Sequence, residues 1–246
     1  MNVIRDTNVS ADLDTKLGKN TWWKPEIDKK VLKELSVKRS LPGIIYVSLY
    51  FLALVVSGCL AYYTWGTYWT ILWFWIYGTI YTFSGAYDHE SRHRTLFKER
   101  WLNDIFQYIF SFMTNFEPVR WRWTHTLHHS YTLHTKEPHD FEIQVDRPSK
   151  LIKYFLSFIP FGPLLWIHQS YLVETLKNSL GIMTPVIKDC VPQQHQWKVF
   201  LSARIHMLIW LIIITYSIYF QTILPILFFL LPTFYGNTLF YLCGLT

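Results

Sequence analysis

The chain has 246 residues, of which 51% are hydrophobic and 19% aromatic, whereas only 16% are charged. So small a charged fraction argues against an ordinary soluble domain, although a large soluble core stays open as the alternative to a membrane protein. The net charge of +6 does not predict a nucleic-acid partner, because acids are interleaved with the Lys and Arg residues. Anionic lipid headgroups are the simpler partner.

Within the first 87 residues a charged segment is followed by an uncharged one. Residues 1–40 carry nine Lys and Arg residues and six acids, whereas residues 41–87 contain no charged residue. A bilayer core about 30 Å thick needs roughly 20 apolar residues per helix, so the uncharged run is long enough for two crossings and a turn. The turn is expected at Thr64–Thr67, between the spans Ile44–Tyr63 and Tyr68–Tyr87.

A polar middle segment and a second uncharged run complete the chain. Residues 88–204 hold fourteen Lys and Arg residues and eleven acids. Within them Trp101–Phe116 and Leu151–Trp166 are typical of short interfacial helices, and Pro160 and Pro163 break the second. Residues 205–246 are again uncharged. This second run predicts a second membrane hairpin, with spans expected at Leu201–Phe220 and Ile223–Tyr241.

These segments predict an all-α membrane protein with four transmembrane helices arranged as two hairpins. The domains are a cytosolic N-terminal segment (1–40), the first hairpin (41–87), a cytosolic and interfacial helical segment (88–204) and the second hairpin (205–246). Because a hairpin returns the chain to its starting side, both charged segments face one compartment, and the positive-inside bias makes that compartment the cytosol. The endoplasmic reticulum and the bacterial inner membrane both remain open as the host membrane.

The first histidine cluster follows the first hairpin and reads Asp88-His89-Glu90-Ser91-Arg92-His93. On a helix, positions i and i+4 share a face, so His89 and His93 can converge on one ion. The same residues form HExxH, the pattern of zinc metalloproteases, in which Glu90 would be the general base. Such a short motif is weak evidence by itself. Glu90 and Asp88 are better candidates for hydrogen bonds to ligand histidines than for catalysis.

The second cluster makes a metal site the stronger prediction. Its three imidazoles, His125, His128 and His129, have i, i+3 and i+4 spacing and are expected on one helical face. A metal would hold them neutral and remove the cost of crowding three cations, whereas the alternative is a solvated histidine-rich turn. The run Glu137–Asp140 that follows is either an ordinary loop or the source of a carboxylate that orients a ligand imidazole.

The setting of the clusters favours iron over zinc. Imidazole ligands suit iron, copper and zinc alike. A site at the mouth of an apolar helix bundle, however, is suited to oxidising a long apolar chain, and unactivated carbon requires an oxidant made from dioxygen. No catalytic residue beyond the metal ligands and no organic cofactor site is predicted.

Together, HxxxH after a membrane hairpin, HxxHH on the same side and a second hairpin resemble the integral-membrane fatty acid desaturases, within the histidine-box superfamily of desaturases and hydroxylases. The resemblance covers residues 41–246 and is most specific over Trp121–Thr132. It implies oxygen-dependent desaturation of a fatty acyl or lipid substrate, two iron ions, dioxygen as co-substrate, and electrons from an external b-type cytochrome or ferredoxin. The metal ligands that it implies are His89, His93, His125, His128 and His129.

One departure from the family pattern concerns a third histidine box, another HxxHH after the fourth span. The sequence reaches Thr246 without it, so we expect a C-terminally incomplete chain with an incomplete metal set. Two other functions stay open. The first is a membrane zinc metalloprotease that uses the HExxH of residues 89–93, and the second is a non-catalytic truncated relative of the desaturases.

Overall fold

The computed structural model describes residues 26–132, 140, 142 and 151–243, so much of the predicted N-terminal segment lies outside the described residues. The chain divides into two units, Met1–Val37 and Lys38–Thr246. The described part of the first unit contains the short helix α2, Lys29–Leu35, which begins where the Asp28 side chain accepts a hydrogen bond from the Lys30 N–H at 2.6 Å. All regular structure in the described residues is helical, which confirms the all-α prediction.

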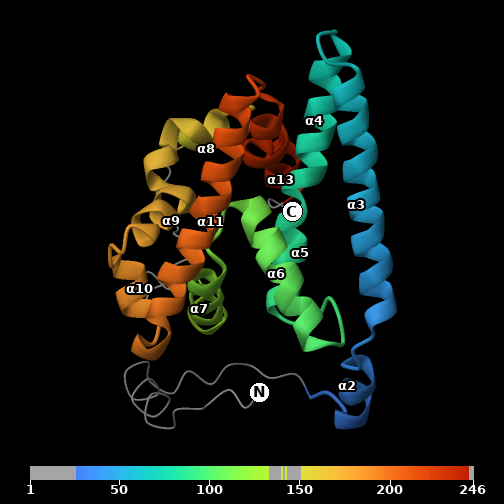
Figure 1. The fold of residues 1–246 in the computed structure, drawn as a ribbon. Helices are drawn as coiled ribbons and strands as arrows, with labels where there is room; N and C mark the ends of the chain where they lie inside the picture. Colours follow the sequence, from blue (N-terminus) through green and yellow to red (C-terminus); the bar gives the residue numbers. More distant parts are fainter. Residues whose placement is uncertain (1–25, 133–139, 141, 143–150, 244–246) are drawn as a thin grey trace. The chain divides into compact units, whose positions relative to one another are not determined.

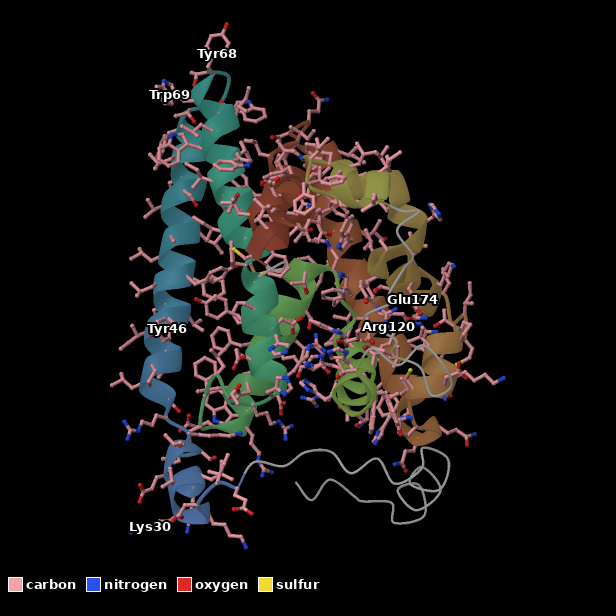
Figure 2. The ribbon with its side chains drawn as sticks, turned by 180° about the vertical axis from the view of Figure 1, so that it is seen from behind. Lys30, Tyr46, Tyr68, Trp69, Arg120 and Glu174 are labelled. Carbon is pink, nitrogen blue, oxygen red and sulfur yellow. The ribbon has the colours of Figure 1, made fainter. Side chains whose placement is uncertain are left out.

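The second unit begins with a helical hairpin. Helices α3, Ser40–Tyr63, and α4, Trp69–Thr82, pack side by side (Figure 1), and the predicted turn near Thr64–Thr67 is confirmed between them. At this turn Tyr68 and Trp69 extend away from the helices and are 95% and 63% exposed (Figure 2). The inner side of the hairpin is aromatic and apolar, since Val47, Tyr50 and Leu54 of α3 pack against Tyr77 and Tyr81 of α4.

Three helices of the polar segment follow, namely α5, Ser84–Arg92, α6, Arg100–Thr114, and α7, Pro118–Tyr131. Helix α6 packs on both α5 and α7. It ends at Asn115, whose φ of 61° allows the chain to reverse, and α7 begins directly afterwards. The Glu117 carboxylate starts α7 by accepting hydrogen bonds from the N–H groups of Val119 and Arg120 at 2.9 and 2.6 Å.

The rest of the polar segment is made of short elements. They are α8, Leu151–Ser157, the 3₁₀ helix η2, Gly162–Gln169, and the α-helices α9, Tyr171–Ser179, and α10, Pro185–Cys190. The predicted break within Leu151–Trp166 is confirmed, because α8 and η2 are separate elements and the chain turns at Phe161 with a φ of 65°. Helix α9 packs along α11, Gln193–Tyr219 (Figure 1).

The prediction of one continuous helix over Ile223–Tyr241 is wrong. This stretch contains a π-helix, η3, Ile226–Leu230, and two short α-helices, α12, Pro232–Tyr235, and α13, Thr238–Cys243. Proline has no N–H to continue an α-helical ladder, so Pro232 can only begin a new helix. Two carbonyl groups of the π-helix accept hydrogen bonds from α4: the Tyr77 and Tyr81 hydroxyls donate to the Phe228 and Phe229 carbonyls at 2.9 and 3.0 Å.

Among the described residues, two helical stretches are long and apolar enough to cross a membrane, one within Lys29–Tyr63 and the other at Gln193–Tyr219. Only 28% and 22% of their most apolar stretches are buried, whereas a core helix of a soluble protein is mostly buried. The other two predicted spans do not meet the same length criterion. The second is divided at Phe83 between α4 and α5, and the fourth is divided as described above.

Candidate metal centre

Helices α5 and α7 bring four histidines together. His89 lies in α5 and His93 caps its C-terminal end, while His125 and His129 lie one turn apart in α7. The His93 Nε2 atom is 3.3 Å from that of His89, 2.9 Å from that of His125 and 3.1 Å from that of His129. One ring nitrogen from each of the four residues lies within 4.8 Å of every other.

These distances fit ligation of one ion. Imidazole nitrogens bind a first-row metal at about 2.0–2.1 Å, which places neighbouring ligand nitrogens roughly 3 Å apart. The four converging Nε2 atoms cannot all be paired by hydrogen bonds to one another, because a neutral imidazole carries only one N–H. A cation at their centre would satisfy all four lone pairs, so the donor set matches a metal site.

Two carboxylates from the segment after α7 set the orientation of two histidines. Glu142 Oε2 lies 2.8 Å from His125 Nδ1, and Asp140 Oδ2 lies 2.8 Å from His128 Nδ1. An Nδ1–H that donates to a carboxylate leaves Nε2 deprotonated and free to bind a metal. Glu142 is itself held in place, because its Oε1 accepts from Thr124 and its N–H donates to Asp140.

His128 does not join the four-histidine group. Successive residues of an α-helix are rotated by about 100°, so His128 and His129 point in directions a quarter-turn apart even though both lie near His125. In the structure His128 faces Asp140, which is fully buried, and its own side chain is 15% exposed. The predicted shared face is confirmed for His125 and His129. The His128 ring lies 5.8 Å from that of His125 and 5.6 Å from that of His129, but its Nδ1 is turned to Asp140.

The acids of the first cluster differ in role. Glu90 is exposed, and its Oε2 accepts a hydrogen bond from the Thr95 hydroxyl at 2.6 Å, while its Oε1 is 3.4 Å from His89 Nδ1. The expectation that Asp88 bonds a ligand histidine is wrong. Asp88 is buried and accepts both of its strongest hydrogen bonds from Arg92, at 2.9 and 2.8 Å.

Two of the four imidazoles, those of His93 and His129, have lowered pKa values. The pKa of His93 is lowered to about 4, chiefly by burial and also by the neighbouring imidazoles of His89, His125 and His129. Burial also lowers the pKa of His129, with His125 as the next contribution. Neutral imidazole is the form that binds a metal, so the crowding of the rings prepares the site for an ion.

The four-histidine group borders a hollow of about 520 Å³. Its wall carries two arginines and two hydroxyl side chains besides the histidines, and its lining residues are Arg92, His93, Arg122, His125, Thr126, His129 and Ser130. The four-histidine group is thus open to this hollow. Two histidines outside the group lie elsewhere, with His195 stacked on Trp123 and His206 buried against Phe112.

Sequence reasoning missed Glu142 and the residues that surround Arg92. For the run Glu137–Asp140 the sequence left an ordinary loop and an orienting carboxylate both open, and Asp140 is such a carboxylate. No spacing rule selects Glu142, which lies in the same polar stretch. Residues 133–139, including His134 and His139, lie outside the described residues.

Comparison with known proteins identifies the family. The family model for fatty acid desaturases matches residues 63–243, a range that includes all five predicted ligand histidines and α4 to α13. Searches of the curated proteins and of the solved structures gave no match. Because the family model covers well over half of the chain and spans the histidine group, the chain belongs to the fatty acid desaturase family.

Proposed function

We propose that this protein is a membrane-bound, oxygen-dependent desaturase of a fatty acyl chain or lipid, with iron held by its histidines. The observation that carries the proposal is the convergence of four Nε2 atoms from α5 and α7 at 2.9–3.3 Å. The first iron would be held by His89, His93, His125 and His129. His128, with its Nδ1 held by Asp140, is available to the second iron of the family's pair.

The reaction requires dioxygen and an external reductant. Removing two hydrogens from adjacent carbons and reducing dioxygen to two waters consumes two electrons and two protons, which a b-type cytochrome or ferredoxin would supply. Iron would activate the dioxygen when bound. The contribution of the chain would be to orient its imidazoles and to favour the neutral form of His93: Glu142 fixes the His125 tautomer, and burial lowers the pKa of His93.

We further propose that the chain crosses the bilayer four times. The domains are those expected from the sequence: 1–40, a first hairpin 41–87, the cytosolic segment 88–204 and a second hairpin 205–246. Support comes from the exposed apolar surfaces of α3 and α11 and from the tyrosine hydrogen bonds that satisfy the carbonyls of the broken fourth segment. Two hairpins would leave both charged segments and the histidines on the cytosolic side of either candidate membrane.

The zinc protease hypothesis has weaker support. A general base must reach the attacking water, whereas the Glu90 carboxylate is bonded to Thr95. Moreover, His89 and His93 share their centre with His125 and His129, which a protease of this type would leave unexplained.

The test is iron content together with lipid products. The purified chain is expected to bind iron, and with a reductase system and dioxygen it should convert saturated acyl chains to products lacking two hydrogens, measured by mass spectrometry. His125→Ala should lose both properties, whereas His168→Ala, at an exposed histidine of η2, should keep them. Equal iron content in His125→Ala and the wild type would refute the metal assignment. Iron without lipid oxidation would favour the non-catalytic relative.

A further inference from the structure

Arg92 lies between the two histidines of α5 but points into the protein. Its side chain is 2% exposed, and that of its partner Asp88 is fully buried. Arg92 Nη2 donates to both Asp88 oxygens at 2.9 and 2.8 Å and to the Ser111 hydroxyl of α6 at 3.0 Å. Ser111 in turn donates to Asp88 at 3.0 Å, so three side chains form a closed group between α5 and α6.

The same guanidinium also contacts α7. Its Nη1 donates to the Pro118 carbonyl at 3.3 Å, and its carbon lies 3.5 Å from the centre of the Trp121 ring. Trp121 is backed by Phe116, with ring centres 4.1 Å apart. A planar guanidinium can use its edge for hydrogen bonds and its face for an aromatic ring at the same time, which links α5, α6 and α7 through one side chain.

Three members of this group are close in sequence to a ligand histidine. Asp88 precedes His89 and Arg92 precedes His93, while Trp121 lies one helical turn before His125. A rotation or slide of α5 against α7 would therefore move the two histidine pairs apart and break the Arg92 contacts together.

Stability alone does not account for the group. Burial raises the pKa of Asp88 and lowers the pKa of Arg92, so removal from water opposes both charges. A buried ion pair of this kind adds little net stability, because desolvation offsets the attraction, whereas its directional hydrogen bonds restrict the geometry.

We propose that Arg92 is a positioning residue that fixes α5 against α7, so that His89 and His93 meet His125 and His129 around one ion. Trp121 and Asp88 are its partners in this role. The inference rests on the proposed metal site and concerns residues outside the ligand set.

The principal variant is Arg92→Lys. Lysine keeps a positive charge opposite Asp88, so the buried carboxylate retains a counter-charge, but it cannot form the planar fork or stack on Trp121 in the same way. Binding of Co²⁺ to the metal-free, detergent-solubilised full chain would be followed by visible absorption, which reports the ligand geometry. We expect Arg92→Lys to bind Co²⁺ about 10–100-fold more weakly, with an altered spectrum.

A second pair of variants separates positioning from folding. Trp121→Leu should also weaken Co²⁺ binding, whereas Trp121→Phe, which keeps an aromatic face for the guanidinium, should restore most of it. The control is Asn103→Ala, at a fully buried residue of α6 that bonds the Phe97 and Glu99 backbone and does not contact Arg92. Thermal unfolding of all four variants is measured in parallel.

Three outcomes are distinguishable. Weaker binding and a changed spectrum in Arg92→Lys and Trp121→Leu, with wild-type binding in Asn103→Ala at comparable loss of thermal stability, would support the positioning role. Wild-type Co²⁺ affinity in both Arg92→Lys and Trp121→Leu, or an equal loss in Asn103→Ala, would overturn it. A wild-type protein that binds no Co²⁺ would instead refute the proposed metal site.

Discussion

Glu142 illustrates how one carboxylate outside a ligand set controls the chemistry of a ligand. It accepts from His125 Nδ1 at 2.8 Å, with both side chains about nine-tenths buried. His125 is the ligand candidate that contacts both His93 and His129, so its orientation affects the whole group.

Replacing Glu142 should therefore weaken the metal site. We expect Glu142→Gln to lower metal affinity about 10–100-fold, because the amide holds the imidazole less strongly and reduces the basicity of Nε2. The control is Glu90→Gln, whose carboxylate is half exposed and 3.4 Å from His89, and a smaller loss is expected there. Competition with a chelator measures both, and equal losses would contradict a special role for Glu142.

Arg120 presents a different case, in which a buried charge forms an ion pair with a residue of another helix. Its side chain is 1% exposed, and Nη1 lies 2.7 Å from Glu174 Oε2 of α9 (Figure 2). The angle departs from that of a hydrogen bond, so the contact is chiefly electrostatic. The Glu174 carboxylate also accepts from the Thr184 hydroxyl at 2.9 Å, which connects α7 to α9 and the start of α10.

Removing this partner should destabilise the fold. Glu174→Ala leaves Arg120 charged and buried, and breaking a buried pair costs about 3–5 kcal/mol. The double variant Arg120→Met with Glu174→Leu should recover much of the loss, because neither charge is then left unpaired. Thermal or denaturant unfolding in detergent measures both, and a stable single variant would indicate that Arg120 has another counter-charge.

Helix packing between α4 and α12 depends on two glycines. A Cβ atom on Gly78 would lie 2.2 Å from the Tyr235 ring and 3.2 Å from the Gly236 Cα, and one on Gly236 would lie 1.9 Å from the Gly78 carbonyl carbon. The close approach also allows the Tyr77 and Tyr81 hydroxyls to reach the π-helix. The first hairpin and the C-terminal segment are thus joined by backbone contact.

An added methyl group at this crossing should separate the two elements. We expect Gly236→Ala to cost about 1–3 kcal/mol or more, because backbone atoms cannot give way as a side chain can. Gly58→Ala is the graded control, since its Cβ would lie 3.2 Å from the edge of the Tyr77 ring. Equal unfolding temperatures for the two variants would contradict the close packing of α4 on α12.

The proposed topology of the whole chain is based on where the charges lie. Every charged residue falls in 1–40 or 88–204, so two hairpins place all of them on one side of the membrane. In a eukaryotic host, an engineered Asn-x-Thr glycosylation site in the Thr64–Thr67 turn should therefore be modified in the lumen. A site placed at Gly181, in the turn after α9, should stay unmodified.

This experiment also distinguishes the number of crossings. Gel mobility before and after glycosidase treatment reports each site. Modification at both positions, or at Gly181 alone, would reject the two-hairpin topology. It would leave the metal assignment untouched, because the four-histidine group depends only on contacts within the second unit.

The sequence by itself determined the class of fold, the turn of the first hairpin and the histidines of the site. These features are local: an uncharged run of sufficient length is recognisable in any context, and i, i+4 spacing places His89 near His93 and His125 near His129 on their own helices. The family resemblance depended on the same local patterns, and the match over residues 63–243 confirmed it.

Only the tertiary structure decided how the two histidine pairs meet. Contacts between α5 and α7 depend on helix crossing angles and on side chains far apart in sequence, such as Arg92 and Trp121, which no spacing rule connects. The same reason explains why Glu142 was missed, why His128 faces Asp140, and why the last segment is broken where Gly236 meets Gly78. Periodicity describes one helix at a time, whereas a metal site requires the relative placement of several.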